Sequence, residues 1–60
     1  MLVRVVYKGN VTEVMIHEGG VVADAVIAAG VVGSSGRYKV TNIPVCSITP
    51  LREGDVLEVI

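Results

Sequence analysis

The sequence contains no tryptophan and no phenylalanine, and two tyrosines are its only residues of the Phe, Trp and Tyr group. Proteins that bind single-stranded nucleic acid stack bases on aromatic side chains. They also need clustered lysine and arginine to neutralise phosphates, whereas five basic and six acidic residues give this chain a net charge of −1. The composition therefore argues against nucleic acid as a partner.

Cysteine and histidine are equally scarce, with only Cys46 and His17. One cysteine cannot form a disulfide within the chain, and two such residues are too few for a structural zinc site. A Cys–His nucleophilic pair requires contact between its members. We expect His17 to be solvated at the end of a strand and Cys46 to be a small buried residue in a late strand. We therefore expect no catalytic activity, no cofactor and no metal.

Long apolar runs are also missing, although 52% of the residues are hydrophobic. A membrane-spanning helix needs ~20 consecutive apolar residues, and no run in this sequence approaches that length. The first residues, Met1-Leu2-Val3-Arg4, lack the basic and apolar regions of a secretory signal peptide. The default interpretation is a cytoplasmic protein with a free thiol and no membrane partner.

Sixty residues correspond to one domain, 1–60, near the lower size limit for a core that folds without a disulfide or metal. Alternating β-branched residues predict strands at 2–8 and 11–17, joined by a two-residue Gly9-Asn10 turn. Apolar residues at helical spacing predict a short helix that begins near Val22 and ends at Gly30. A third strand is predicted at 37–41, and Pro44 is expected to interrupt the chain before a short strand near 45–46.

The final strand is predicted at 56–60. A hairpin followed by a helix does not fit alternating parallel α/β units. The sequence therefore predicts an α+β fold, with four or five strands in a mixed sheet and the helix packed on one face. We expect the last strand to lie between earlier strands of that sheet.

Two segments carry a family resemblance, "VVADAVIAAGV" after the hairpin and "TPLREGDVLEV" near residue 60. Together with the element order, they resemble the β-grasp, ubiquitin-like fold, and most closely the small sulfur carriers of thiamine and molybdopterin biosynthesis. The matching residues are Val22, Ala25 and Val26 in the helix and Thr49, Leu51, Gly54 and Asp55 in the turn. In the turn, we expect Leu51 to reach the core, Gly54 to take a positive φ and Asp55 to bond neighbouring amides.

The chain departs from the sulfur carriers in two places. Asn42 is followed by Ile43, where the family usually has an Asn-Gly turn, so we expect this part of the fold to differ locally. Family members that carry sulfur end in Gly-Gly, whose carboxylate is adenylated and then thiolated. If Ile60 is the natural end, that route is closed to this chain.

Strand alternation assigns the side chains to two faces of the sheet. We expect the core to contain Val3, Val5, Tyr7, Val14, Ile16, Tyr38, Val40, Leu57 and Val59. The opposite face, which should be polar if it is solvated, instead carries many apolar residues. Large exposed apolar patches mark interfaces, and charged residues form their rims. The candidate protein-binding residues are Leu2, Arg4, Val6, Val11, Met15, Val56, Glu58 and Ile60. The alternative is that valines are frequent because they favour strands, and that Arg4 and Glu58 break the patch.

These features predict a non-catalytic adaptor that works through protein–protein contacts of its open sheet face. The partner can be a second copy, an enzyme or a larger assembly. A chain of this size also suits a phage-encoded protein, either a virion component or a binder of a host enzyme. The alternative function is a sulfur-carrier-like protein whose Gly-Gly tail is missing or replaced.

Overall fold

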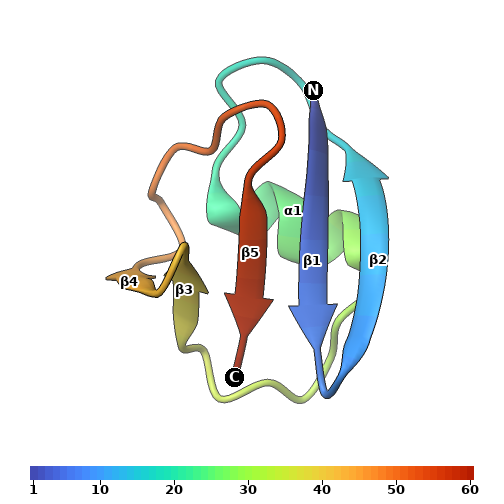
Figure 1. The fold of residues 1–60 in the computed structure, drawn as a ribbon, viewed down its shortest axis with the longest axis vertical. Helices are drawn as coiled ribbons and strands as arrows, with labels where there is room; N and C mark the ends of the chain where they lie inside the picture. Colours follow the sequence, from blue (N-terminus) through green and yellow to red (C-terminus); the bar gives the residue numbers. More distant parts are fainter.

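Five strands and one helix make up the computed structural model, which describes residues 1–60 (Figure 1). The elements are β1 (Leu2–Tyr7), β2 (Asn10–Met15), α1 (Val22–Ala29), β3 (Tyr38–Val40), β4 (Ile43–Val45) and β5 (Val56–Val59). The α1 helix is too short to cross a membrane.

The strands form a single mixed sheet in the order β2-β1-β5-β3-β4. The two hairpins, β1–β2 and β3–β4, are antiparallel, and β5 lies between them, parallel to β1 and antiparallel to β3. The α1 helix crosses one face of the sheet and leaves the other open (Figure 1). This arrangement confirms the predicted α+β class, the helix on one face and the last strand between earlier ones.

The first hairpin turn lies one residue earlier than predicted. Tyr7 pairs with Asn10, so Lys8 and Gly9 form the two-residue loop and Asn10 already belongs to β2. Both loop residues have positive φ, 48° and 79°, as the mirror-image turns that suit a twisted hairpin require. Because Asn10 pairs with Tyr7, the two loop residues with positive φ are Lys8 and Gly9, and not the predicted Gly9 and Asn10.

The second hairpin also differs from the prediction, because its turn consists of Thr41 and Asn42. These residues have φ values of 51° and 61°, so Ile43 is not required to adopt a positive φ. Pro44 does not interrupt the strand. It lies in the middle of β4 opposite Lys39, which is possible because β4 is an edge strand, where proline is tolerated.

At both ends of the α1 helix, main-chain N–H groups form hydrogen bonds with residues close in the sequence. The Val21 N–H donates to the Asp24 carboxylate at 2.9 Å, which places a negative charge in the first turn. At the other end Gly30 adopts a left-handed conformation with φ 71°, and its N–H donates to Ile27. Gly30 thus ends the helix as predicted, and Val21 is the N-terminal cap.

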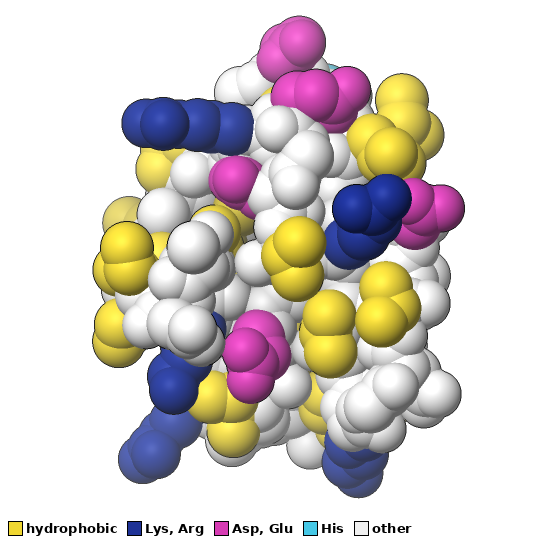
Figure 2. Space-filling view, in the orientation of Figure 1, with side chains coloured by type: hydrophobic (Ala, Val, Ile, Leu, Met, Phe, Trp, Pro, Cys, Tyr) yellow, Lys and Arg dark blue, Asp and Glu magenta, His cyan; other side chains and the backbone are white.

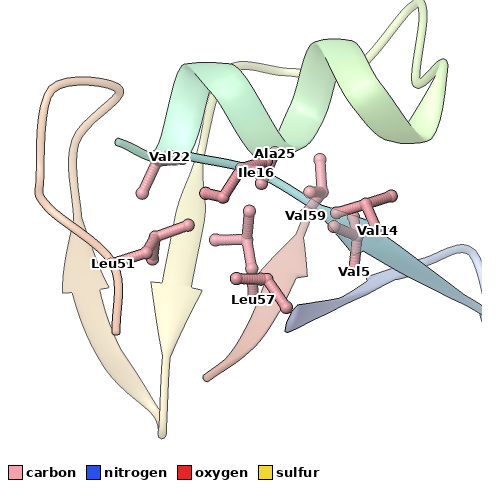
Figure 3. Close-up of a cluster of buried hydrophobic side chains, with 9 residues drawn as sticks. Val5, Val14, Ile16, Val22, Ala25, Leu51, Leu57 and Val59 are labelled. Atoms are coloured by element: carbon pink, nitrogen blue, oxygen red, sulfur yellow. The ribbon is translucent and has the colours of Figure 1, made fainter. Parts of the chain in front are cut away.

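The core lies between α1 and the sheet (Figure 3). The buried hydrophobic residues are Val3, Val5, Val14, Ile16, Val22, Ala25, Leu51, Leu57 and Val59. Three residues predicted to be in the core, Tyr7, Tyr38 and Val40, are only half-buried. The helix packs against β1 and β2 and has eight residues, about 12 Å in length. It is therefore too short to cover the ends of the sheet and β3 as well.

The loop that precedes β5 closes the other end of the core. Leu51 is buried, and its N–H donates to the Gly20 carbonyl at 2.9 Å. The Arg52 N–H donates to the Asp55 carboxylate at 2.8 Å, and Gly54 has φ 82°. The predicted roles of Leu51, Gly54 and Asp55 in this turn are confirmed.

Candidate functional site

The predicted protein-binding residues lie on β1, β2 and β5 and on Ile60, which follows β5. Within each strand they lie an odd number of positions from the buried core residues, so they share the sheet face that α1 does not cover. Val11 and Met15 are 62% and 71% exposed, and Val56 and Ile60 are about half exposed. Leu2 and Val6 are half-buried. We refer to this surface, formed by Leu2, Arg4, Val6, Val11, Met15, Val56, Glu58 and Ile60, as the open face.

Strand pairing brings some of these residues together. Val6 on β1 lies directly opposite Val11 on β2. On the other side of β1, Arg4 lies opposite Val56 on β5. Residues two apart along a strand share a face, so Val56 is a diagonal neighbour of Val6. Val6, Val11 and Val56 therefore form an apolar group, which we call the valine group, at the centre of the β2-β1-β5 half of the sheet.

Charged residues separate the other apolar residues from the valine group. Arg4 and Glu13 lie opposite each other and form an ion pair of 3.1 Å, with both side chains about half exposed. This pair lies between the valine group and the Leu2–Met15 pair. Glu58 lies opposite Val6 on one side and Lys39 on the other, and it separates Ile60 from the rest. The structure thus divides the predicted surface into three parts.

The space-filling view of this face shows the same division (Figure 2). Apolar side chains are grouped near the centre, with blue and magenta charged side chains beside them. An exposed ion pair contributes about 0–1 kcal/mol to stability. The Arg4–Glu13 pair, with both side chains about half exposed, therefore contributes little to the stability of the fold.

Ile60 is fixed at the end of the sheet by hydrogen bonds on both of its main-chain groups. Its N–H donates to the Arg37 carbonyl at 3.0 Å. Its carbonyl oxygen accepts bonds from the Ser35 N–H and from the Ser35 hydroxyl, at 3.0 and 2.7 Å. The main chain of Ile60 is therefore held beside Arg37, at the margin of the open face.

Cys46 is exposed, contrary to the prediction that it is buried. It follows β4, and the turn at 46–49 carries it away from the sheet: the Thr49 N–H donates to the Cys46 carbonyl, and the Cys46 N–H donates to the Thr49 hydroxyl at 3.0 Å. The sequence contains a signal for this turn, because Ser47 lies within the segment and Pro50 follows it. The apolar character of a thiol favours burial, but the hydrogen bonds of the turn decide the position of Cys46.

The thiol of Cys46 also contacts the Thr49 hydroxyl, with 3.4 Å between Sγ and Oγ1. This hydrogen bond, with a smaller contribution from the Ile48 backbone, holds the pKa of the Cys46 thiol below its ordinary value. A hydroxyl that donates to sulfur favours the thiolate.

His17, as predicted, is a solvated residue beyond the end of a strand, and its Nε2 lies 4.0 Å from the Asp24 carboxylate.

We expect Cys46 to react with iodoacetamide at lower pH than it does in the unfolded chain. The thiolate is the nucleophile, so a lowered pKa moves the midpoint of the rate–pH profile downward. Thr49→Val removes the hydroxyl and should move this midpoint back up, whereas Thr49→Ser should retain the folded value. Identical profiles for the folded and the urea-unfolded chain would contradict this assignment.

No cluster of three or more histidine, cysteine or acidic residues suited to a metal ion occurs in the structure. Comparison with models of known protein families, with curated proteins and with solved structures found no match.

Proposed function

We propose that this chain is a non-catalytic binding protein of the β-grasp fold that recognises a protein partner through its open face. Two arguments support the fold. The features that suggested a β-grasp fold from the sequence are the first hairpin, the helix and the Gly54-Asp55 turn before the last strand. The sheet has β5 parallel to β1 at its centre, which is compatible with that fold.

The observation that carries the proposed function is the valine group. Val6, Val11 and Val56 lie on the sheet face opposite α1, and no other segment of the chain covers that face (Figure 1). A sheet face in contact with water is ordinarily polar. Apolar side chains grouped there are stabilised when a partner removes them from water, by about 25 cal/mol per Å² of apolar area.

The charged residues around the valine group supply the second property of an interface. Arg4 and Glu13 lie on one side of it, and Glu58 and Lys39 lie on the other. Interfaces combine an apolar centre with a charged rim that selects the partner and aligns it. The open face therefore has both an apolar centre to give affinity and a mixed-charge rim to give specificity.

We expect the double variant Val6→Lys/Ile60→Lys to lose partner binding and to remain folded. Ile60 is about half exposed and Val6 is half-buried, so the free energy of unfolding should fall by about 1 kcal/mol or less. Binding should weaken severely because each lysine would be buried without a partner charge. The immobilised chain is used to capture proteins from its source cells, which mass spectrometry identifies, and the affinity is then measured with the purified partner.

The matched control is Ile27→Lys. Ile27 is an exposed isoleucine on α1, 77% accessible, and it lies on the helix side of the molecule. This control makes the same chemical change away from the open face, so binding should persist. If Ile27→Lys abolishes binding while the double variant still binds, the partner contacts the helix and the proposal is wrong.

A further inference from the structure

The two edges of the sheet are formed by β2 and β4. An edge strand presents main-chain N–H and C=O groups that no neighbouring strand satisfies, and another extended chain can pair with them. Figure 1 shows no segment lying outside β2. The two edges differ in how many of these groups they offer.

The register of the first hairpin shows which groups of β2 point outward. Met1 and Ile16 exchange hydrogen bonds in both directions across the β1–β2 pair. Bonded and non-bonded pairs alternate along an antiparallel ladder, so the N–H and C=O groups of Val11, Glu13 and Met15 point away from β1. All three residues are exposed, and each has a free N–H to donate.

The β4 edge offers much less. The Thr41-Asn42 turn makes Val40 and Ile43 the bonded pair that closes the hairpin. The outward position of this short strand is therefore Pro44, which has no N–H. Proline at this position blocks strand addition. The β2 edge has no proline, and its one charged side chain, Glu13, is already paired with Arg4.

Two observations and one symmetry argument favour a second copy of this chain as the strand that adds to β2. The net charge of −1 gives two copies little electrostatic repulsion. Only ten of the sixty residues are buried, and domains with so small a core commonly gain stability by association. Two identical strands that pair antiparallel can also be related by a two-fold axis, the commonest symmetry of dimers.

Charge selects the register of such a pair. If the two-fold axis passed through Glu13, the two glutamates would face each other, which is destabilising. A slide of two residues places Glu13 opposite Val11 of the other copy, and these residues exchange both main-chain bonds. Thr12 then faces Thr12 of the other copy, a favourable cross-strand pair.

We propose that this chain forms a two-fold dimer by antiparallel pairing of β2 with β2 of a second copy, centred on Thr12. The axis is perpendicular to the sheet, so the two sheets become continuous and both helices lie on the same side. The open faces of the two copies also lie on one side, with their Val11 side chains near the junction. The dimer therefore presents a partner surface twice as wide as one copy offers.

The first test is sedimentation velocity over a wide range of concentrations, with Val11→Pro compared with Val11→Thr. The proline reproduces at β2 the situation of Pro44, because it removes one outward N–H, and it should raise the dimer dissociation constant by about tenfold or more. Val11→Thr keeps the N–H and should still dimerise. If the proline variant does not fold, a synthetic chain with N-methylated Val11 removes the same hydrogen.

A second measurement addresses the register. In a Cys46→Ser background, Thr12→Cys should form an intermolecular disulfide rapidly, because opposed non-bonded positions bring their side chains close. Glu13→Cys should form it slowly. The proposal is overturned if the chain stays monomeric at all concentrations, if Val11→Thr loses the dimer as Val11→Pro does, or if Glu13→Cys cross-links faster than Thr12→Cys.

Discussion

We expect Leu57→Ala to leave the chain largely unfolded at room temperature. Leu57 has no exposed surface and lies in β5, opposite Val5 on one side and Val40 on the other. Truncation of a buried leucine costs about 2–5 kcal/mol, because apolar contacts are lost and a cavity remains. The core of so small a domain rarely supplies more than about 3–5 kcal/mol. The loss is therefore comparable to the entire stability.

Urea unfolding followed by circular dichroism measures this loss. The matched control is Val56→Ala, which shortens the preceding residue of the same strand on the open face, where Val56 is about half exposed. We expect that variant to remain folded, with a cost of about 1 kcal/mol or less. A Leu57→Ala chain as stable as Val56→Ala would show that β5 does not present Leu57 to the core in solution.

We expect the second largest loss of stability from Gly20→Ala. Gly20 is buried, and its carbonyl accepts the Leu51 N–H, so it links the segment before α1 to the late loop. A Cβ at this position would lie 2.8 Å from Ile16 Cδ1 and 3.0 Å from the His17 carbonyl oxygen. The Cδ1 atom cannot move freely because Ile16 is packed in the core, and the His17 carbonyl oxygen is held by the hydrogen bond that it accepts from the Gly20 N–H. Overpacking of this kind costs about 1–3 kcal/mol.

A double-mutant cycle with Ile16→Val separates the crowding from other effects. Valine lacks the Cδ1 atom that the new methyl group would meet first. Gly20→Ala should therefore cost less in the Ile16→Val background than in the parent chain, and the difference is the coupling energy. Equal costs in both backgrounds would show that the side chain of Ile16 is not the obstacle.

The parts of the fold that follow from local periodicity were predictable. Alternation in β1, β2 and β5 identified Val3, Val14 and Leu57 as core residues, because one residue faces the helix at every second position. Gly30 marked the end of α1 through its tolerance of positive φ. The turns were less predictable, since Lys8 and Thr41 adopt positive φ without being glycine or asparagine. These conformations are imposed by the pairing of the strands on either side of each turn. The local sequence pattern does not show which residues pair.

The candidate site followed from the same alternation, but its subdivision did not. Val6 meets Val11, and Arg4 meets Glu13, only because of the register of a hairpin whose turn was predicted one residue too late. Cys46 was predicted to be buried in a late strand, because a free thiol behaves as a small hydrophobic side chain. Its exposure results from a hydrogen bond between its own N–H and the Thr49 hydroxyl, a contact that competes with strand continuation.

The position of β5 has a consequence for how the chain folds during synthesis. In the order β2-β1-β5-β3-β4, the two hairpins share no strand pairing, and only β5 joins them. The β5 strand leaves the ribosome after the other four, so the nascent chain carries two unconnected hairpins until then. An isolated hairpin is at best marginally stable in water. Stable folding therefore waits for the release of β5, and until then the valines of β1 remain accessible to chaperones.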